Sequence, residues 1–166
     1  MTGLRTYQGR NEMHGNSDHK MHYMHFAIML ALSFLLMFGF MYAMVDKLAN
    51  VYPNINQAYM AGLMVAPMAV LELALMSSMY PSKNLNWAII ASSVILLLVC
   101  WVGIRDQLAV NDKSFLRSMI PHHAGAILMC QQASLKDAEI KNLCGEIISS
   151  QTKEIAQMKD ILARNP

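Results

Sequence analysis

Cysteine and charged residues are both scarce in this chain of 166 residues. It has three cysteines and no CxxC pair, which argues against a disulfide-rich scaffold and against a zinc finger. Only 14% of the residues are charged and the formal net charge is +2, so no strong field for binding nucleic acid is expected. The apolar share is 55%, which is high for a soluble domain. The chain also holds 16 methionines, a marked excess for its length.

Three long runs of apolar residues predict membrane-spanning helices. About 20 apolar residues are enough to cross the hydrocarbon core of a bilayer as a helix. The first run is too long for the apolar region of a signal peptide, and no small-residue cleavage site follows it. The predicted partner of this part of the chain is therefore the lipid bilayer. The runs cover about residues 25–45, 59–79 and 87–104 of a membrane region at residues 25–106.

The second run is unusual because it contains Pro67, which should kink a helix, and Glu72, which should face protein or water. Several side chains of this run share one helical arc with Glu72, and methionines of the first run share another. If the two arcs meet, they form a thioether-lined seam in which Cu(I) can bind or pass. Ordinary helix packing produces the same clustering and is the favoured alternative. The seam residues are Met64, Met68, Glu72 and Met79, facing Met29, Met37, Met41 and Met44.

The stretch before the first run, residues 1–24, is polar and lacks apolar periodicity, so we expect a mobile tail. It contains several Met-His pairs, and His-rich tracts of this kind can collect copper loosely. The alternatives are a solvated tail without metal, or histidines that lie among lipid headgroups. The residues of this secondary candidate site are His14, His19, Met21, His22, Met24 and His25.

Residues 111–166 have the pattern of two water-soluble amphipathic helices. Asp112 is predicted to cap the first helix, and Pro121 is expected to bend or restart it. Asp137 is predicted to cap the second helix, and the short join at Leu135-Lys136 predicts antiparallel neighbours. The expected fold class is therefore all-α, with three transmembrane helices followed by an antiparallel helical hairpin.

The first helix of this hairpin carries two adjacent histidines, His122 and His123, between Met119 and Met129. Steps of three and seven residues return to nearly the same helical face, so Met119, His122 and Met129 can point one way. His123 then points about 100° away. Thioether and imidazole together suit a soft or borderline metal, copper above all. The alternative is a pair of surface histidines beside ordinary core methionines.

Antiparallel geometry predicts which residues of the second helix face these histidines. Counting from a turn near Lys136 places them opposite about residues 149–151, with Glu154 one turn further. Glu154 would fix the tautomer of an imidazole or bind the metal itself, or it would merely hydrogen-bond across the hairpin. The predicted copper site comprises Met119, His122, His123, Met129, Glu154 and Met158.

Cys130 and Cys144 lie on either side of the same turn and are expected to face each other. The sequence does not decide whether the two cysteines form a disulfide or act as soft metal ligands. Two small buried apolar residues are the favoured interpretation, because free cysteine is often simply buried. Cys100 lies within the third span and is expected to pack there.

The hairpin resembles the bacterial family called domain of unknown function 305, over about the last third of the chain. The resemblance implies a ferritin-like helical fold and an association with copper and heavy-metal resistance, some members binding copper outside the cytoplasm. It implies no catalytic activity, so we do not expect an enzyme, and this chain resembles a multi-pass membrane branch. The resemblance rests on Phe115-Leu116, Met119-Ile120-Pro121-His122-His123, Ala126-Ile127, Met129, Glu139-Ile140, Ile147-Ile148, Gln151, Glu154-Ile155 and Met158.

A hairpin of two helices cannot readily bury a full core. We expect it to be half of a ferritin-like four-helix bundle, completed by a second copy in a homo-oligomer. Three spans place the termini on opposite sides of the membrane, and the flanking basic residues are almost balanced. The resemblance therefore decides the expected orientation. It implies a bacterial inner-membrane protein with a cytoplasmic N-terminus and a periplasmic hairpin.

The sequence thus favours a membrane-anchored copper-binding protein that buffers copper or hands it on in metal homeostasis or resistance. Copper efflux proteins or copper chaperones are its expected partners, and nucleic acid is not. A copper transporter or copper redox enzyme is one alternative, and a structural helical interaction module without metal is another. The structural alternative gives no reason for Met119, His122 and Met129 to share one helical face.

Overall fold

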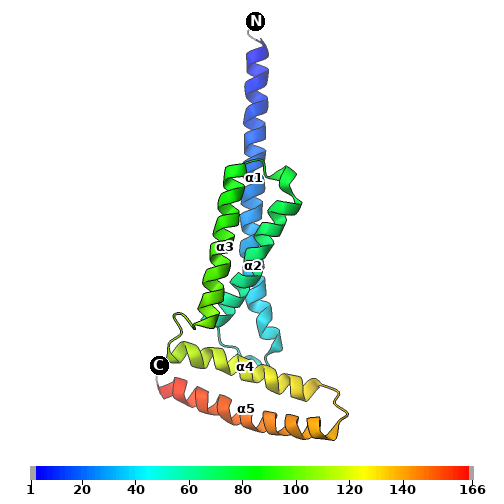
Figure 1. The fold of residues 1–166 in the computed structure, drawn as a ribbon, viewed down its shortest axis with the longest axis vertical. Helices are drawn as coiled ribbons and strands as arrows, with labels where there is room; N and C mark the ends of the chain where they lie inside the picture. The colour runs from blue at the N-terminus through cyan, green and yellow to red at the C-terminus, as the bar shows by residue number, and fades with distance from the viewer. Residues whose placement is uncertain (1–2, 165–166) are drawn as a thin grey trace. The chain divides into compact units, whose positions relative to one another are not determined.

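The computed structural model describes the backbone of residues 3–164 and the side chains of residues 20–164. Within residues 3–164 the chain forms five α-helices with three short 3-10 turns between them, as Figure 1 shows, and this confirms the all-α fold class. The elements are α1 (Gly3–Phe40), η1 (Met41–Met44), η2 (Leu48–Asn50), α2 (Ile55–Leu75), η3 (Ser77–Met79), α3 (Lys83–Arg105), α4 (Asp112–Gln132) and α5 (Ala138–Arg164).

Three segments are long and apolar enough to cross a membrane, namely Lys20–Met44, Ile55–Leu75 and Lys83–Arg105. The number of spans agrees with the sequence prediction, but the second one starts earlier than predicted. Its helix begins at Ile55 because the Asn54 side chain accepts a hydrogen bond from the Gln57 backbone amide at 3.0 Å. Such a cap satisfies an amide that would otherwise lack a partner at the helix start.

The backbone of α1 is helical from Gly3, so it includes the stretch for which the sequence predicted an irregular, mobile tail. Helix formation is cooperative, and each added residue contributes one hydrogen bond once a helix exists. The apolar first span supplies that helix, and the polar residues before it extend it. Among the tail candidates, His14 and His19 lie outside the residues whose side chains the structure describes.

The chain divides into two compact units. The span unit consists of Met1–Leu36 and Ala61–Cys100, and the hairpin unit consists of Met37–Met60 and Trp101–Pro166. Each unit has a buried apolar cluster of its own, so each is described separately below.

In the span unit, α1, α2 and α3 lie side by side (Figure 1). Phe26 of α1 is buried against Leu73 of α2 and against Tyr80, which follows η3. At Gly62 a β-carbon would lie 2.6 Å from Cys100 Sγ, so only glycine allows α2 and α3 to approach this closely. Cys100 is buried and unbonded, as its predicted packing role requires.

In the hairpin unit, α4 and α5 run antiparallel around a buried cluster (Figure 1). Asp137 caps α5 as predicted, because its Oδ1 accepts from the Glu139 amide at 2.8 Å. The predicted cap of α4 was wrong by one residue. Asn111 is the cap, and its side chain accepts from the Ser114 amide at 2.8 Å. The cluster comprises Ile120, Ala124, Ile127, Ile155 and Met158.

Pro121 was predicted to bend or restart the helix. It does not restart it, because it lies inside the continuous α4 and is buried there. Packing of the neighbouring Ile120 and Ala124 in the core holds the helix together across the missing hydrogen bond. The interpretation of Cys130 and Cys144 as buried apolar residues is also wrong, because they form a disulfide with a Cα–Cα distance of 5.3 Å. This bond ties α4 to α5 near their join.

Candidate metal site

One face of α4 lines a cavity of about 480 Å³ in the hairpin unit. Met119, His122 and Met129 all contribute to its wall, as expected for residues three and ten positions apart on one helix. Ser118, which precedes Met119, and Ala126 belong to the same wall. The sequence prediction that Met119, His122 and Met129 share a face therefore agrees with the walls of this cavity.

The opposite wall is formed by segments that precede the hairpin in the sequence. Met41 and Met44 come from η1, and Met60 comes from the first two turns of α2. Together with Met119 and Met129 they bring five thioethers to a cavity that holds one imidazole, that of His122.

η1 lies against α4 at Gly125. A β-carbon at Gly125 would lie 3.4 Å from the backbone oxygen of Met44 and 4.0 Å from its β-carbon. These are ordinary van der Waals distances, so alanine would fit here, whereas a longer side chain would enter the space that Met44 occupies.

The start of α2 is also fixed within the hairpin unit. The Tyr59 hydroxyl donates to the backbone oxygen of Leu108 at 2.9 Å. The ring of Tyr59 lies against Gly103, where a β-carbon would meet it at 2.8 Å. Asn56 donates to the side chain of Gln107 at 3.0 Å. These contacts position Met60, which follows Tyr59 directly.

His123 belongs to a different environment from His122. Its Nδ1 lies 3.0 Å from Glu154 Oε2 of α5, and its side chain is 13% exposed. The contact lacks hydrogen-bond geometry, so Nδ1 is a buried polar atom without a hydrogen-bond partner among the described residues. Burial lowers the pKa of His123 below its usual value, Glu154 opposes that shift, and His122 adds to it.

The six residues predicted for the copper site thus fall into three places. Met119, His122 and Met129 line the cavity. His123 and Glu154 face each other, and the ring centres of His122 and His123 are 6.2 Å apart. Met158 is buried in the core of the hairpin unit, with Met119 packed against that core as the antiparallel register predicted.

The register prediction placed Glu154 one turn too far from the histidines. Side chains on a helix lean toward its N-terminus, so the Glu154 carboxylate lies over the preceding turn of α5. That displacement brings it opposite His123, where the sequence prediction had placed about residues 149–151.

The donor atoms present fit copper better than a hard cation. Within the described residues, no group of three or more His, Cys, Asp or Glu side chains is arranged to hold a metal ion. Carboxylate-rich or thiolate-rich sites of the kinds that hold calcium or zinc are therefore not assembled in that part of the chain. The cavity gathers methionines and an imidazole, which suit copper, beside the neutral side chains of Asn54, Asn56, Gln57 and Ser118.

The remaining candidate residues do not line this cavity. On α1, Met21, Met24 and His25 are exposed and His22 is partly exposed. In the proposed seam, Met64 is 47% exposed, and Glu72 accepts a hydrogen bond from the Tyr80 hydroxyl at 3.2 Å. Met79 packs against the buried cluster of the span unit, and Met68 is partly exposed. Glu72 is therefore partnered by a tyrosine.

Sequence reasoning missed the contribution of Met60 altogether and assigned Met41 and Met44 to the membrane seam. All three residues flank the loop at residues 45–54, and a short loop between two spans returns the chain to the same side of the membrane. That connection was the available signal that Met44 and Met60 lie near each other.

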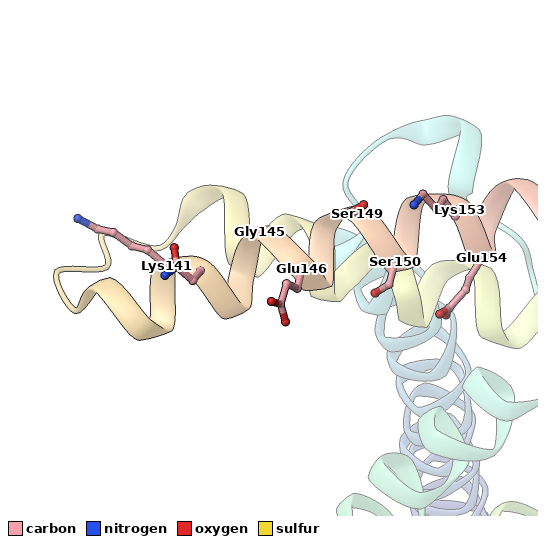
Figure 2. Close-up of a pocket in the computed structure, with 8 residues that line it drawn as sticks. Lys141, Gly145, Glu146, Ser149, Ser150, Lys153 and Glu154 are labelled. Atoms are coloured by element: carbon pink, nitrogen blue, oxygen red, sulfur yellow. The ribbon is translucent and has the colours of Figure 1, made fainter.

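The outer face of α5 carries polar side chains and a shallow hollow that this helix alone lines. Figure 2 shows Glu146, Ser150 and Glu154 projecting to the same side of the helix, as a spacing of four residues requires. Because a single helix lines it, this hollow gathers no donor from another element, and Glu154 acts through His123 instead.

Comparison with known proteins places this architecture in a family. Residues 104–162 match the family described as domain of unknown function (DUF305). An uncharacterized protein of Acanthamoeba polyphaga mimivirus is 36% identical over 119 residues, which cover 70% of this chain and 76% of the relative. The chain belongs to the DUF305 family. No solved structure matches it.

The similarity to the viral relative is not confined to the hairpin. Residues 104–166 are too few to hold an alignment of 119 residues, so part of the apolar helical region is included.

Proposed function

We propose that this chain is a membrane-anchored copper-binding protein that buffers copper or hands it on, with copper as its cargo. The observation that carries the proposal is the cavity that joins His122 to Met119 and Met129. Imidazole binds both copper oxidation states and thioether favours Cu(I), so this pairing suits an ion whose valence changes. His123, the next residue of α4, faces Glu154 of α5 outside the cavity, and we propose that this pair orients the helix that carries His122.

The proposed location is a bacterial cytoplasmic membrane, with the N-terminus in the cytoplasm and the ferritin-like hairpin in the periplasm. The disulfide between Cys130 and Cys144 supports this orientation, because disulfides persist in the periplasm and are rare in the cytoplasm. Copper efflux proteins or chaperones outside the cytoplasm are the proposed partners. A reporter fused after residue 166 should be active in the periplasm, and a cytoplasmic signal would overturn the orientation.

Metal analysis of the full-length protein in mild detergent tests the copper proposal. The protein is loaded with copper, desalted, and its copper content per chain is measured under oxidising and reducing conditions. The variant His122→Ala/His123→Ala should retain much less copper than wild type, with unchanged helicity. The matched control Gln131→Ala/Gln132→Ala alters two exposed residues of the same helix and should retain copper normally.

A second variant asks whether the tail histidines hold the metal instead. Replacing His14, His19, His22 and His25 by alanine should reduce copper content less than replacing His122 and His123. His122 lines a cavity together with five methionines, so an ion there can gather several ligands at once. If the tail variant loses copper and the His122→Ala/His123→Ala variant keeps it, the site is misplaced.

A further inference from the structure

The cavity beside His122 contains more thioethers than the DUF305 segment supplies. Met119 and Met129 lie inside the matched residues 104–162, whereas Met41, Met44 and Met60 lie outside them. All five methionines nevertheless line the same cavity of the hairpin unit. The rest of the wall is therefore built in part by residues at the adjoining ends of the first two candidate spans.

We infer that this cavity is a binding site for a soft monovalent cation, Cu(I) or Ag(I), completed by Met41, Met44 and Met60. This inference rests on the proposed copper function and narrows it to one cation class and one ligand set. His122 is the single imidazole of the set, and His123 with Glu154 lies outside it.

The chemistry of the wall supports this assignment. A thioether is an uncharged soft donor that favours Cu(I), whereas Zn²⁺ takes thiolate, imidazole or carboxylate ligands. The described residues assemble no cluster of three His, Cys, Asp or Glu side chains that would favour Cu(II) or Zn²⁺ instead. The wall also carries neutral oxygen donors but no carboxylate or thiolate, namely the side chains of Asn54, Asn56, Gln57 and Ser118. Thioethers are therefore the most numerous donors of the wall, and they favour Cu(I).

The local structure holds these donors in place while leaving their side chains adaptable. The backbone of Met44 lies against Gly125 of α4, and the hydrogen bond from Tyr59 to Leu108 fixes the turn that precedes Met60. Methionine is unbranched and has three rotatable side-chain bonds, so its sulfur can turn toward a bound ion. The backbone is held in place while the methionine side chains can rotate. Their sulfur atoms can therefore converge on a cation that is much smaller than the cavity.

Accidental packing of apolar methionines is the competing explanation, because methionine commonly fills irregular gaps. Packing alone would be satisfied equally well by leucine, since exchanges between leucine and methionine conserve volume. Leucine would not support cation binding, because its side chain has no donor atom. Substitution of methionine by leucine therefore separates the two explanations.

The test measures Ag(I) and Cu(I) affinity of full-length protein in mild detergent by competition with a chromogenic chelator. The variant Met41→Leu/Met44→Leu/Met60→Leu should lose about tenfold or more in affinity, since even outer partners of a metal contribute about 10–100-fold. The control Met76→Leu removes an exposed thioether of the span unit that belongs to no candidate site and should bind as wild type does. Circular dichroism checks that all variants have wild-type helicity.

X-ray absorption of the Cu(I)-loaded protein gives an independent readout. We expect a sulfur-dominated ligand shell with one nitrogen in the wild type, and loss of sulfur ligands in the Met41/Met44/Met60 variant. Added Zn²⁺ should not displace Ag(I) from the wild type.

The failures of the two proposals are distinguishable. Wild-type affinity in the Met41/Met44/Met60 variant, combined with copper loss in His122→Ala/His123→Ala, overturns this inference and leaves the copper function standing. An equal loss of affinity in the control Met76→Leu also overturns it. A wild-type protein that binds neither copper nor silver overturns both.

Discussion

His123 Nδ1 of α4 lies 3.0 Å from Glu154 Oε2 of α5, without the geometry of a hydrogen bond. The two groups therefore interact mainly through charge, and only while the imidazole is protonated. Burial of the imidazole acts against protonation, and this effect is the larger one, because the pKa of His123 lies below its usual value.

The first prediction concerns this pair. Replacing Glu154 by glutamine removes the negative charge that favours the imidazolium, so the pKa of His123 should fall further. A histidine NMR titration of the metal-free protein measures this change. The control Glu146→Gln alters a carboxylate on the same side of α5 and should leave the titration unchanged. A higher pKa in Glu154→Gln would show that the carboxylate does not act through its charge.

The same pKa shift sets the direction of a pH dependence. The unfolded chain takes up a proton at the usual histidine value near 6.5, whereas folded His123 does so only at lower pH. Between those values the unfolded state binds more protons, so His123 makes the folded state less stable as the pH falls below about 6.5. Thermal unfolding of wild type and His123→Gln between pH 7.5 and 5.5, values chosen around the usual pKa, should show a smaller acid-induced loss in the variant.

The second prediction concerns the disulfide between Cys130 and Cys144. The two cysteines are 14 residues apart, and closing a loop of about 15 residues contributes about 3 kcal/mol of stability in the chain-entropy treatment. Reduction, or the variant Cys130→Ala/Cys144→Ala, should therefore lower the unfolding temperature of the hairpin. Cys100→Ala is the control for loss of a cysteine outside the bond. Equal stability with and without the bond would contradict the prediction.

Local sequence signals predicted the helices well, because caps and apolar periodicity act over a few residues. Asp137 was found since its side chain reaches amides only two and three residues away. The cap of α4 was misassigned because Asn111 and Asp112 are equally good capping residues, and only the structure shows which one reaches Ser114. Packing around Pro121 also overrode the local preference of proline.

The candidate site was predictable only in part, because only some of its residues lie close together on one helix. The shared face of Met119, His122 and Met129 follows from helical periodicity. The approach of Met41, Met44 and Met60 depends instead on how the loop at residues 45–54 folds back onto α5. A contact between Lys159 and Asn50, separated by 109 residues, fixes that path, and no local pattern encodes such a distance.

The third prediction tests this contact. Asn50 is fully buried, accepts a hydrogen bond from Lys159 Nζ at 2.6 Å, and donates one to Asp46 at 2.5 Å. Asn50→Ala removes both of these hydrogen bonds. The free energy of unfolding should fall by about 1–3 kcal/mol, which is the penalty for leaving a buried polar group unsatisfied. Thermal unfolding measures the loss. Asn142→Ala, on the exposed face of α5, should unfold like wild type, and equal behaviour of both variants would contradict the assigned role.

The fourth prediction is that the protein forms a homo-oligomer through its hairpins. Phe115 of α4 and Ile140 and Leu143 of α5 are each about half exposed, at 49%, 48% and 53%. Ile140 and Leu143 lie three residues apart and share one face of α5. A two-helix hairpin buries too little apolar surface alone, and a second copy offers the same surface in return. Mass measurement by light scattering in mild detergent should therefore give a multiple of the chain mass.

Charge substitution on that face separates oligomer formation from detergent effects. Ile140→Lys/Leu143→Lys places two like charges where the copies would meet, so the mass should fall toward that of one chain. The control Asn142→Lys/Ser149→Lys adds the same charge at exposed polar residues of α5 and should keep the wild-type mass. If the wild type is a stable monomer, or if both variants dissociate alike, the apolar face of Ile140 and Leu143 does not hold copies together.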